Sequence, residues 1–287
     1  MVVGSGEETT QTLLATRPIP SSGELLPVIG LGTNLTFDVG GAAAPLRTLR
    51  AVLVRFAALG GWLIDTSPMY GNAEAVVGTL AAEAGLTQRL FWATKIWTTG
   101  KDAGIEQMEE SQRRLQAHPL DLVQIHNLME WQVHLDTLVA WKREGRIRYL
   151  GITHYHPGAL AEVAEVLKEH SLDFVQVPYN IANREAEQEI FPLAADLGVA
   201  VIANVPLGHG ALMRTVQGRP LPRLAAELGC RDWASFLLKF VLGHPAVTCA
   251  IPATADLAHL EADLTAGVGP FPDAAQRTQM LALVAKW

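Results

Sequence analysis

Short apolar runs alternate with helix-like segments eight times along this chain, from about residue 28 onward. The runs have the length and composition of strands and stand at 28–32, 62–65, 90–95, 122–126, 147–153, 174–177, 199–203 and 247–251. No linker-like segment and no change of register interrupts them. Eight consecutive βα units favour a closed parallel (β/α)8 barrel, an α/β fold, over an open doubly wound sheet.

The segments between the runs carry helix signals. After the first run, five apolar residues fall on one helix face before Gly60 and Gly61 end it; they are Leu46, Leu49, Leu53, Phe56 and Leu59. Asn72 and Asp102 predict the starts of the next two helices. A further helix is expected over about 131–144, and Pro157 opens the one after it.

The chain has a prefix and a suffix outside these eight units. Residues 16–26 have a turn signal at Ser22-Gly23 and predict a small β-hairpin over the N-terminal mouth of the barrel. Residues 272–287 predict an additional C-terminal helix. We expect residues 1–15 to form a flexible extension and residues 1–287 to form a single domain.

Composition narrows the range of partners. Hydrophobic residues make up 49% of the 287 residues, and 29 acidic against 22 basic residues give a formal net charge of −7. That charge disfavours nucleic-acid and anionic-membrane partners, so we expect a small-molecule substrate. No secretory signal is visible, so the cytoplasm is the expected location, with a monomer or weak homo-oligomer. Cys230 and Cys249 lack metal-ligand spacing and are expected to be buried thiols.

Three of the runs end on ionisable residues: Asp65, Lys95 and His126. Tyr70 follows just after the first of them. Active sites of α/β barrels lie at the C-terminal ends of the strands, where these residues are predicted to meet. A carbonyl that accepts hydride needs a proton from a phenol, and a nearby ammonium lowers the phenol pKa while a carboxylate keeps the ammonium charged. A histidine can then hydrogen-bond and position the carbonyl oxygen.

The motifs around these residues resemble those of the aldo-keto reductase superfamily. The resemblance rests on Asp65-Thr66-Ser67-Pro68-Met69-Tyr70-Gly71-Asn72, on Ala93-Thr94-Lys95, on Asp121 to Asn127, and on Gly145 to Thr153, and it covers nearly the whole chain. It implies a barrel that binds NADP(H), with NAD(H) as the alternative cofactor, in extended form and reduces aldehydes or ketones. Tyr70 would be the proton donor, assisted by Asp65, Lys95 and His126.

The resemblance also implies a cofactor site. Thr153, His154 and Gln176 would hold the nicotinamide carboxamide, and the loop from Leu207 to Arg214 would lie over the pyrophosphate. The complete set of implied cofactor residues is Thr153, His154, Gln176, Asn204, Pro206, Leu207, Gly208, Gly210, Arg214, Thr254 and His259. No metal site is expected.

Three positions depart from the family pattern. Thr153-His154 stands where many members have Ser-Asn, and Asn204 stands where an aromatic residue usually stacks on the nicotinamide. Ala253 and His259 replace the usual Lys and Arg that contact the 2′-phosphate. Charge-assisted bonds are about twice as strong as neutral ones, so use of NADH beside or in preference to NADPH is predicted.

Other interpretations remain open from the sequence. Asp65 and Lys95 can be a structural ion pair alone. One alternative is a cofactor-binding redox sensor or accessory subunit with little turnover, and Asn204 is the residue that favours it. Another is a Schiff-base aldolase or isomerase that uses Lys95. His154-Tyr155-His156 is a weak metal motif. Trp97, just beyond Lys95, is a candidate for the substrate pocket.

Overall fold

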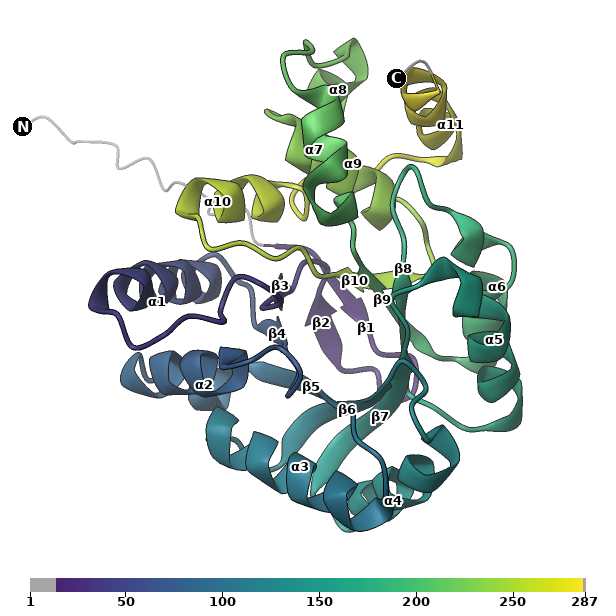
Figure 1. Cartoon of the computed structure of the whole chain (residues 1–287). Coiled ribbons are helices and arrows are strands. Elements are labelled where there is room, and N and C mark those ends of the chain that lie inside the picture. The colour runs from purple at the N-terminus through teal and green to yellow at the C-terminus, as the bar shows by residue number, and fades with distance from the viewer. Residues whose placement is uncertain (1–13, 286–287) are drawn as a thin grey trace, which may run out of the picture.

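Eight parallel strands curl into a closed sheet surrounded by helices in the computed structural model, which describes residues 14–285 (Figure 1). The strands are β3 (Leu31–Gly32), β4 (Leu63–Asp65), β5 (Phe91–Ile96), β6 (Leu120–His126), β7 (Ile147–Thr153), β8 (Phe174–Pro178), β9 (Ala200–Asn204) and β10 (Val247–Ala250). They follow sequence order in the sheet. The Gly30 N–H donates to the Ala250 carbonyl at 2.9 Å, which joins the first strand segment to the last. The predicted (β/α)8 barrel is confirmed.

The outer ring of helices covers this sheet on all sides (Figure 1). It consists of α1 (Ala43–Ala58), α2 (Ala73–Glu83), α3 (Lys101–Leu115), α4 (Trp131–Arg143), α5 (Leu160–Glu169), α6 (Ile190–Leu197), α9 (Trp233–Leu242) and α10 (Leu257–Thr265), with 3-10 turns at Thr87–Arg89, Pro157–Ala159, Glu185–Glu187 and Gly208–Gly210. In α1 the buried face contains Leu49, Leu53 and Phe56 as predicted, together with Val52, whereas Leu46 and Leu59 are half-buried at its margins.

Three helices lie outside the simple repeat. Two short ones, α7 (Ala211–Val216) and α8 (Arg223–Glu227), are inserted between β9 and α9 and were not predicted. The predicted C-terminal helix is α11 (Ala274–Val284), which begins with a capping box at Asp273. Arg277 fixes α11 to the barrel, because its guanidinium donates to the Phe240 carbonyl at 2.7 Å and to the Glu187 carboxylate at 2.6 Å.

The N-terminal hairpin consists of β1 (Thr16–Pro18) and β2 (Leu25–Pro27), paired antiparallel. Ile19 and Leu26 are fully buried and join the apolar residues inside the barrel, so the hairpin closes this end as predicted. Of the predicted extension 1–15, residues 1–13 lie outside the described residues. Leu14 is buried and the Ala15 N–H donates to the Gly267 carbonyl at 2.9 Å, so these two belong to the fold and the predicted boundary is wrong for them.

The two-residue period of the strands divides the barrel interior into two zones. Inward residues near the hairpin are apolar, and they include Leu63, Phe91, Leu122, Tyr149, Phe174 and Cys249. The same two-residue period turns polar side chains inward two or four residues further along the strands, at the opposite end of the barrel. These side chains are Asp65, Lys95, His126, Thr153, Gln176 and Asn204. The strand register therefore gathers these six polar residues at one mouth.

Candidate active site

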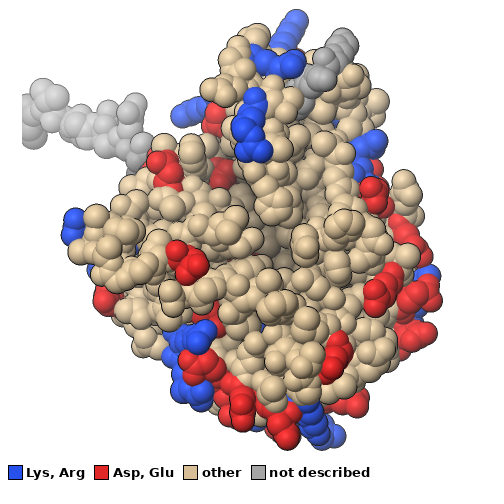
Figure 2. All heavy atoms as spheres, viewed as in Figure 1, with Lys and Arg blue, Asp and Glu red and all other residues tan. Residues whose placement is uncertain are grey.

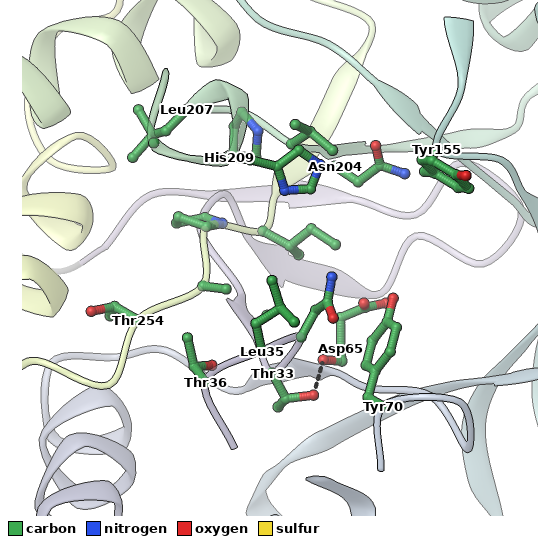
Figure 3. Close-up of a pocket in the computed structure, with 18 of the residues that line it drawn as sticks. Thr33, Leu35, Thr36, Asp65, Tyr70, Tyr155, Asn204, Leu207, His209 and Thr254 are labelled. Atoms are coloured by element: carbon green, nitrogen blue, oxygen red, sulfur yellow. Dashed lines mark hydrogen bonds between the residues drawn. The ribbon is translucent and has the colours of Figure 1, made fainter. Parts of the chain in front are cut away.

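A cavity of about 720 Å³ opens at this mouth, within the usual size range of ligand pockets. In Figure 2 its hollow is surrounded largely by uncharged residues, and most Lys, Arg, Asp and Glu side chains lie toward the periphery of that face. Figure 3 shows Asp65 and Tyr70 on one side of the cavity, with Asn204, Tyr155 and His209 across from them. The loops after several strands thus share a single pocket.

Lys95 and Asp65 form a buried ion pair at the base of the site. The Lys95 Nζ donates to Asp65 Oδ1 at 2.7 Å and to the Thr66 carbonyl at 2.7 Å, and its side chain is completely buried. Gln176 Nε2 donates to the other Asp65 oxygen at 2.8 Å. Burial lowers the pKa of Lys95, but Asp65 and Tyr70 together outweigh it and hold the net pKa above its ordinary value. Lys95 is therefore a charged ammonium.

Tyr70 lies on the loop between β4 and α2 and projects into the cavity (Figure 3). The Lys95 Nζ is 5.2 Å from the centroid of its ring. Burial raises the pKa of Tyr70, the Lys95 ammonium lowers it, and the Asp65 carboxylate raises it again, so the net pKa is above the ordinary value. The predicted fall of this pKa toward neutrality is not found in the protein alone, because burial outweighs Lys95. The phenol thus retains its proton.

His126 ends β6 and lines the same cavity. Its ring lies edge-on to Tyr70 with centroids 6.0 Å apart, and its Nδ1 is 3.2 Å from the Ser67 Oγ. Burial lowers the pKa of His126 to about 3, with the charges of Lys95 and His154 contributing. The imidazole is therefore neutral at physiological pH and can carry only one proton.

Asp65, Tyr70, Lys95 and His126 therefore meet where the sequence predicts them. A family model of the Aldo/keto reductase family matches residues 28–278, which is most of the chain. The chain belongs to the aldo/keto reductase family. Methylglyoxal reductase YeaE of Escherichia coli (strain K12) is 30% identical over 254 residues, which cover 85% of this chain and 86% of that protein.

Solved structures agree with this assignment. An aldo/keto reductase from Klebsiella pneumoniae in complex with NADP and acetate has a TM-score of 0.77 at 28% identity, covering 91% of this chain and 92% of that one. Another structure from that organism, in complex with NADPH, has a TM-score of 0.76 at 27% identity over the same shares. The protein is thus similar over nearly its whole length to aldo/keto reductases that bind nicotinamide cofactors.

The predicted carboxamide site of this aldo/keto reductase is only partly free to bind a ligand. Gln176 lines the cavity, but its Oε1 accepts from Thr153 Oγ1 at 3.0 Å and its Nε2 is bonded to Asp65. Among the described residues, Asn127 and Asn204 each have a buried Oδ1 without a hydrogen-bond partner, and both line the cavity. These two acceptors suit an amide donor. Asn127 ends the family-like motif at 121–127, but no binding role was predicted for it.

The loop after β9 has an unusual backbone. Val205, Gly208, His209 and Gly210 all have positive φ, at 50°, 62°, 50° and 76°. For the β-branched Val205 this conformation is strained, and such strain is common where a backbone is shaped for a ligand. Pro206, Leu207 and Gly210 line the cavity, whereas Gly208 and the exposed Arg214 are not among the lining residues.

The far end of the cavity is lined by Ala253, Thr254, His259 and Asp263. Among described lining residues there is no Lys or Arg. Asp263 is 4% exposed, and burial, together with nearby Asp232, raises its pKa to about 8. No sequence pattern indicated Asp263, which lies one turn after His259 on α10.

Three further interpretations concern His154 as a cofactor contact, the 154–156 segment as a metal motif, and Trp97 as a pocket residue. His154 is not among the lining residues, and its Nδ1 accepts from the His156 N–H at 3.1 Å. His156 Nδ1 accepts from the Gly158 N–H in the same way, and residues 14–285 contain no cluster of three or more metal-ligating side chains. Trp97 does not line the cavity; its backbone N–H and carbonyl bond to Gln107 instead.

No helix in the described chain is both long and apolar enough to cross a membrane.

Proposed function

We propose that this oxidoreductase uses NAD(P)H to reduce aldehydes or ketones to alcohols, with Tyr70 as the proton donor. The observation that carries the proposal is the buried Lys95–Asp65 ion pair beneath the Tyr70 ring at the base of the cavity. The cavity fits the cofactor, because it has two orphaned amide oxygens at Asn127 and Asn204 and a strained backbone loop at 205–210. The bound cofactor supplies the hydride.

Each residue of the site then has a role. Tyr70 holds its proton at neutral pH and gives it to the carbonyl oxygen as negative charge develops there. Lys95 stabilises the phenolate that remains, and Asp65 keeps Lys95 charged and in place. His126, neutral and fixed at the cavity wall, donates a hydrogen bond that orients the carbonyl. Asn127, Thr153 and Asn204 are the proposed carboxamide contacts.

Replacement of the phenol tests this proposal. Tyr70→Phe should lower kcat by at least about 100-fold, because the proton donor is removed. The dissociation constants for NADH and NADPH, measured by fluorescence titration, should remain close to the wild-type values. Near-normal turnover of the variant with an aromatic aldehyde would rule out Tyr70 as the acid.

The cofactor preference follows from the lining of the far end of the cavity. A 2′-phosphate would meet neither Lys nor Arg there. Asp263 is mostly protonated at neutral pH because its pKa is about 8, and it would repel the phosphate only once ionised at higher pH. We therefore expect NADH to bind at least as tightly as NADPH. His259→Arg should tighten NADPH binding about tenfold through a charge-assisted bond while leaving NADH almost unchanged. Equal effects on both cofactors would contradict this placement.

The substrate proposed for this site is an uncharged carbonyl compound. Lys95, buried beneath the cavity, is neutralised by Asp65, and the described lining contains no Lys or Arg for a carboxylate or phosphate. Methylglyoxal, the substrate in the name of the relative YeaE, is small and uncharged and is a suitable first test. A neutral aromatic aldehyde should have a kcat/KM about tenfold or more above that of its 4-carboxy analogue, since an unpaired buried charge is costly.

A redox sensor or accessory barrel is the second candidate, and Asn204 is the observation that favours it. No aromatic ring occupies the position expected to stack on the nicotinamide, although Tyr155 lies beside it (Figure 3). Intact cofactor binding with negligible turnover of many carbonyl compounds would support this alternative. Schiff-base chemistry is less suited to the site, because Lys95 is held as an ammonium and not as a free amine. Borohydride trapping with substrate should therefore give no adduct.

A further inference from the structure

Ser67 connects the two sides of the catalytic site. It lies on the loop between β4 and α2, two residues after Asp65 and three before Tyr70, and its side chain is fully buried. Its Oγ is 3.2 Å from His126 Nδ1, and His126 is itself buried. One loop therefore supplies the carboxylate, the phenol and a hydroxyl that contacts the histidine.

Hydrogen-bond accounting fixes the direction of this bond. The Met69 N–H donates to Ser67 Oγ at 3.3 Å, so the oxygen already accepts one bond. If Nδ1 also donated to it, the Ser67 hydroxyl proton would have no acceptor among the described residues. If the hydroxyl instead donates to Nδ1, both groups are satisfied, which is the arrangement that buried polar groups adopt.

The proton of the neutral imidazole then lies on Nε2. No described residue forms a hydrogen bond with Nε2, and His126 lines the cavity, so the N–H is available to a ligand there. A carbonyl oxygen accepts hydrogen bonds and cannot donate one. The Nε2–H tautomer therefore attracts the substrate oxygen, whereas the Nδ1–H tautomer would present a lone pair and repel it.

We propose that Ser67 is a positioning residue that selects the Nε2–H tautomer of His126 and so makes this histidine a hydrogen-bond donor to the carbonyl oxygen. Ser67 does not touch the substrate in this account but acts through His126. The expected loss of kcat/KM rests on the proposed carbonyl reduction, whereas the expected tautomer of His126 does not. Loss of the hydroxyl should reduce kcat/KM by about 10- to 100-fold, the range found when a hydrogen-bond partner that orients a metal-ligating histidine is removed.

The test measures the tautomer directly. In 15N-labelled protein, long-range 1H–15N NMR distinguishes the two tautomers, and the His126 signals are identified by their loss in His126→Gln. Wild type should show Nε2–H unchanged from pH 5 to 8, and Ser67→Ala should shift His126 toward Nδ1–H. Thr137→Val is the control, because it removes a buried hydroxyl on α4 that has no hydrogen-bond partner. It should change neither the tautomer nor kcat/KM.

Three results would overturn the proposal: an Nδ1–H tautomer in wild type, an unchanged tautomer in folded Ser67→Ala, or a shifted tautomer with unchanged kcat/KM. The wild-type spectrum decides even if Ser67→Ala does not fold. Absence of any carbonyl reduction by wild type would refute the proposed function. The NMR result would then still report on the Ser67–His126 bond, so the two failures are distinguishable.

Discussion

Asp65 accepts hydrogen bonds on both carboxylate oxygens, one from Lys95 and one from Gln176. Lys95, Asp65 and Gln176 are thus a connected set of buried polar groups in which each member satisfies another. Removing one partner from such a set leaves a buried charge without compensation, which costs more than the pair itself contributes. Under the proposed mechanism, stability and catalysis therefore depend on the same atoms at the residue scale.

Lys95→Met should remove activity and also destabilise the fold. Asp65 would remain buried with only the Gln176 donor, so the free energy of unfolding should fall by about 3–5 kcal/mol. Urea denaturation followed by circular dichroism measures this. Lys168→Met, in an exposed ion pair with Glu165 and Glu189, is the matched control and should have little effect. Equal stability of Lys95→Met and wild type would contradict the coupling.

Asp263 should make the stability of the protein depend on pH. Its folded-state pKa of about 8 lies above the ordinary value of 3.8, so its stabilising contribution is complete below about pH 4 and is lost as pH rises through 8. Relative to Asp263→Asn, wild type should lose on the order of a few kcal/mol of unfolding free energy over this range. Asp136→Asn, at an exposed position on α4, should show no such divergence.

At the scale of elements, the loops after neighbouring strands support one another. Asn180, just after β8, donates from Nδ2 to the Val205 carbonyl at 3.0 Å and accepts two backbone N–H bonds on Oδ1. The strained conformation of Val205 after β9 is therefore held by a rigid turn from the adjacent loop. The register of β8 and β9 brings the two loops together.

Asn180→Ala should release this conformation. Without the Nδ2 donor, the positive φ of Val205 is no longer fixed, and we expect the dissociation constant for NADH to rise about tenfold. Fluorescence titration of the purified variant gives this value. Asn183→Ala alters the same turn without touching Val205 and should bind NADH normally. Comparable weakening in both variants would show that Val205 is not the cause.

For the whole molecule, the two ends of the barrel have separate tasks. The hairpin end is filled by apolar side chains, including Ile19 and Leu26, and the opposite end carries the polar site. This division is typical of (β/α)8 barrels, in which one face serves stability and the other serves chemistry. Mutations at the hairpin should therefore affect stability without changing ligand binding.

Leu26→Ala tests that separation. A cavity at a fully buried position should reduce the free energy of unfolding by about 2–5 kcal/mol. The NADH dissociation constant of the folded variant should remain at the wild-type value. Leu25→Ala removes the neighbouring side chain, which is 53% exposed, and should cost little. A large change in NADH affinity in Leu26→Ala would show that the two ends are coupled.

The sequence by itself determined the eight βα units, the closing hairpin, the C-terminal helix and the positions of Asp65, Tyr70, Lys95 and His126. These features depend on local periodicity and on the residue at the end of each strand, which can be read along the chain. The helices α7 and α8 were missed, because the chain between β9 and α9 does not follow the repeat. The two-residue strand period was sufficient to bring Asp65, Lys95 and His126 to one mouth, and the loop after β4 adds Tyr70.

Only the tertiary structure decided the protonation and the free hydrogen-bonding capacity of the site. Burial, which depends on barrel closure, raised the pKa of Tyr70 where its neighbour Lys95 alone predicted a decrease. The Ser67–His126 hydrogen bond joins the loop after β4 to the end of β6, and Asp263 reaches the cavity from α10. No local sequence pattern encodes contacts between elements that are distant along the chain. Local order follows from sequence spacing, whereas desolvation and unpaired polar atoms depend on packing across the whole barrel.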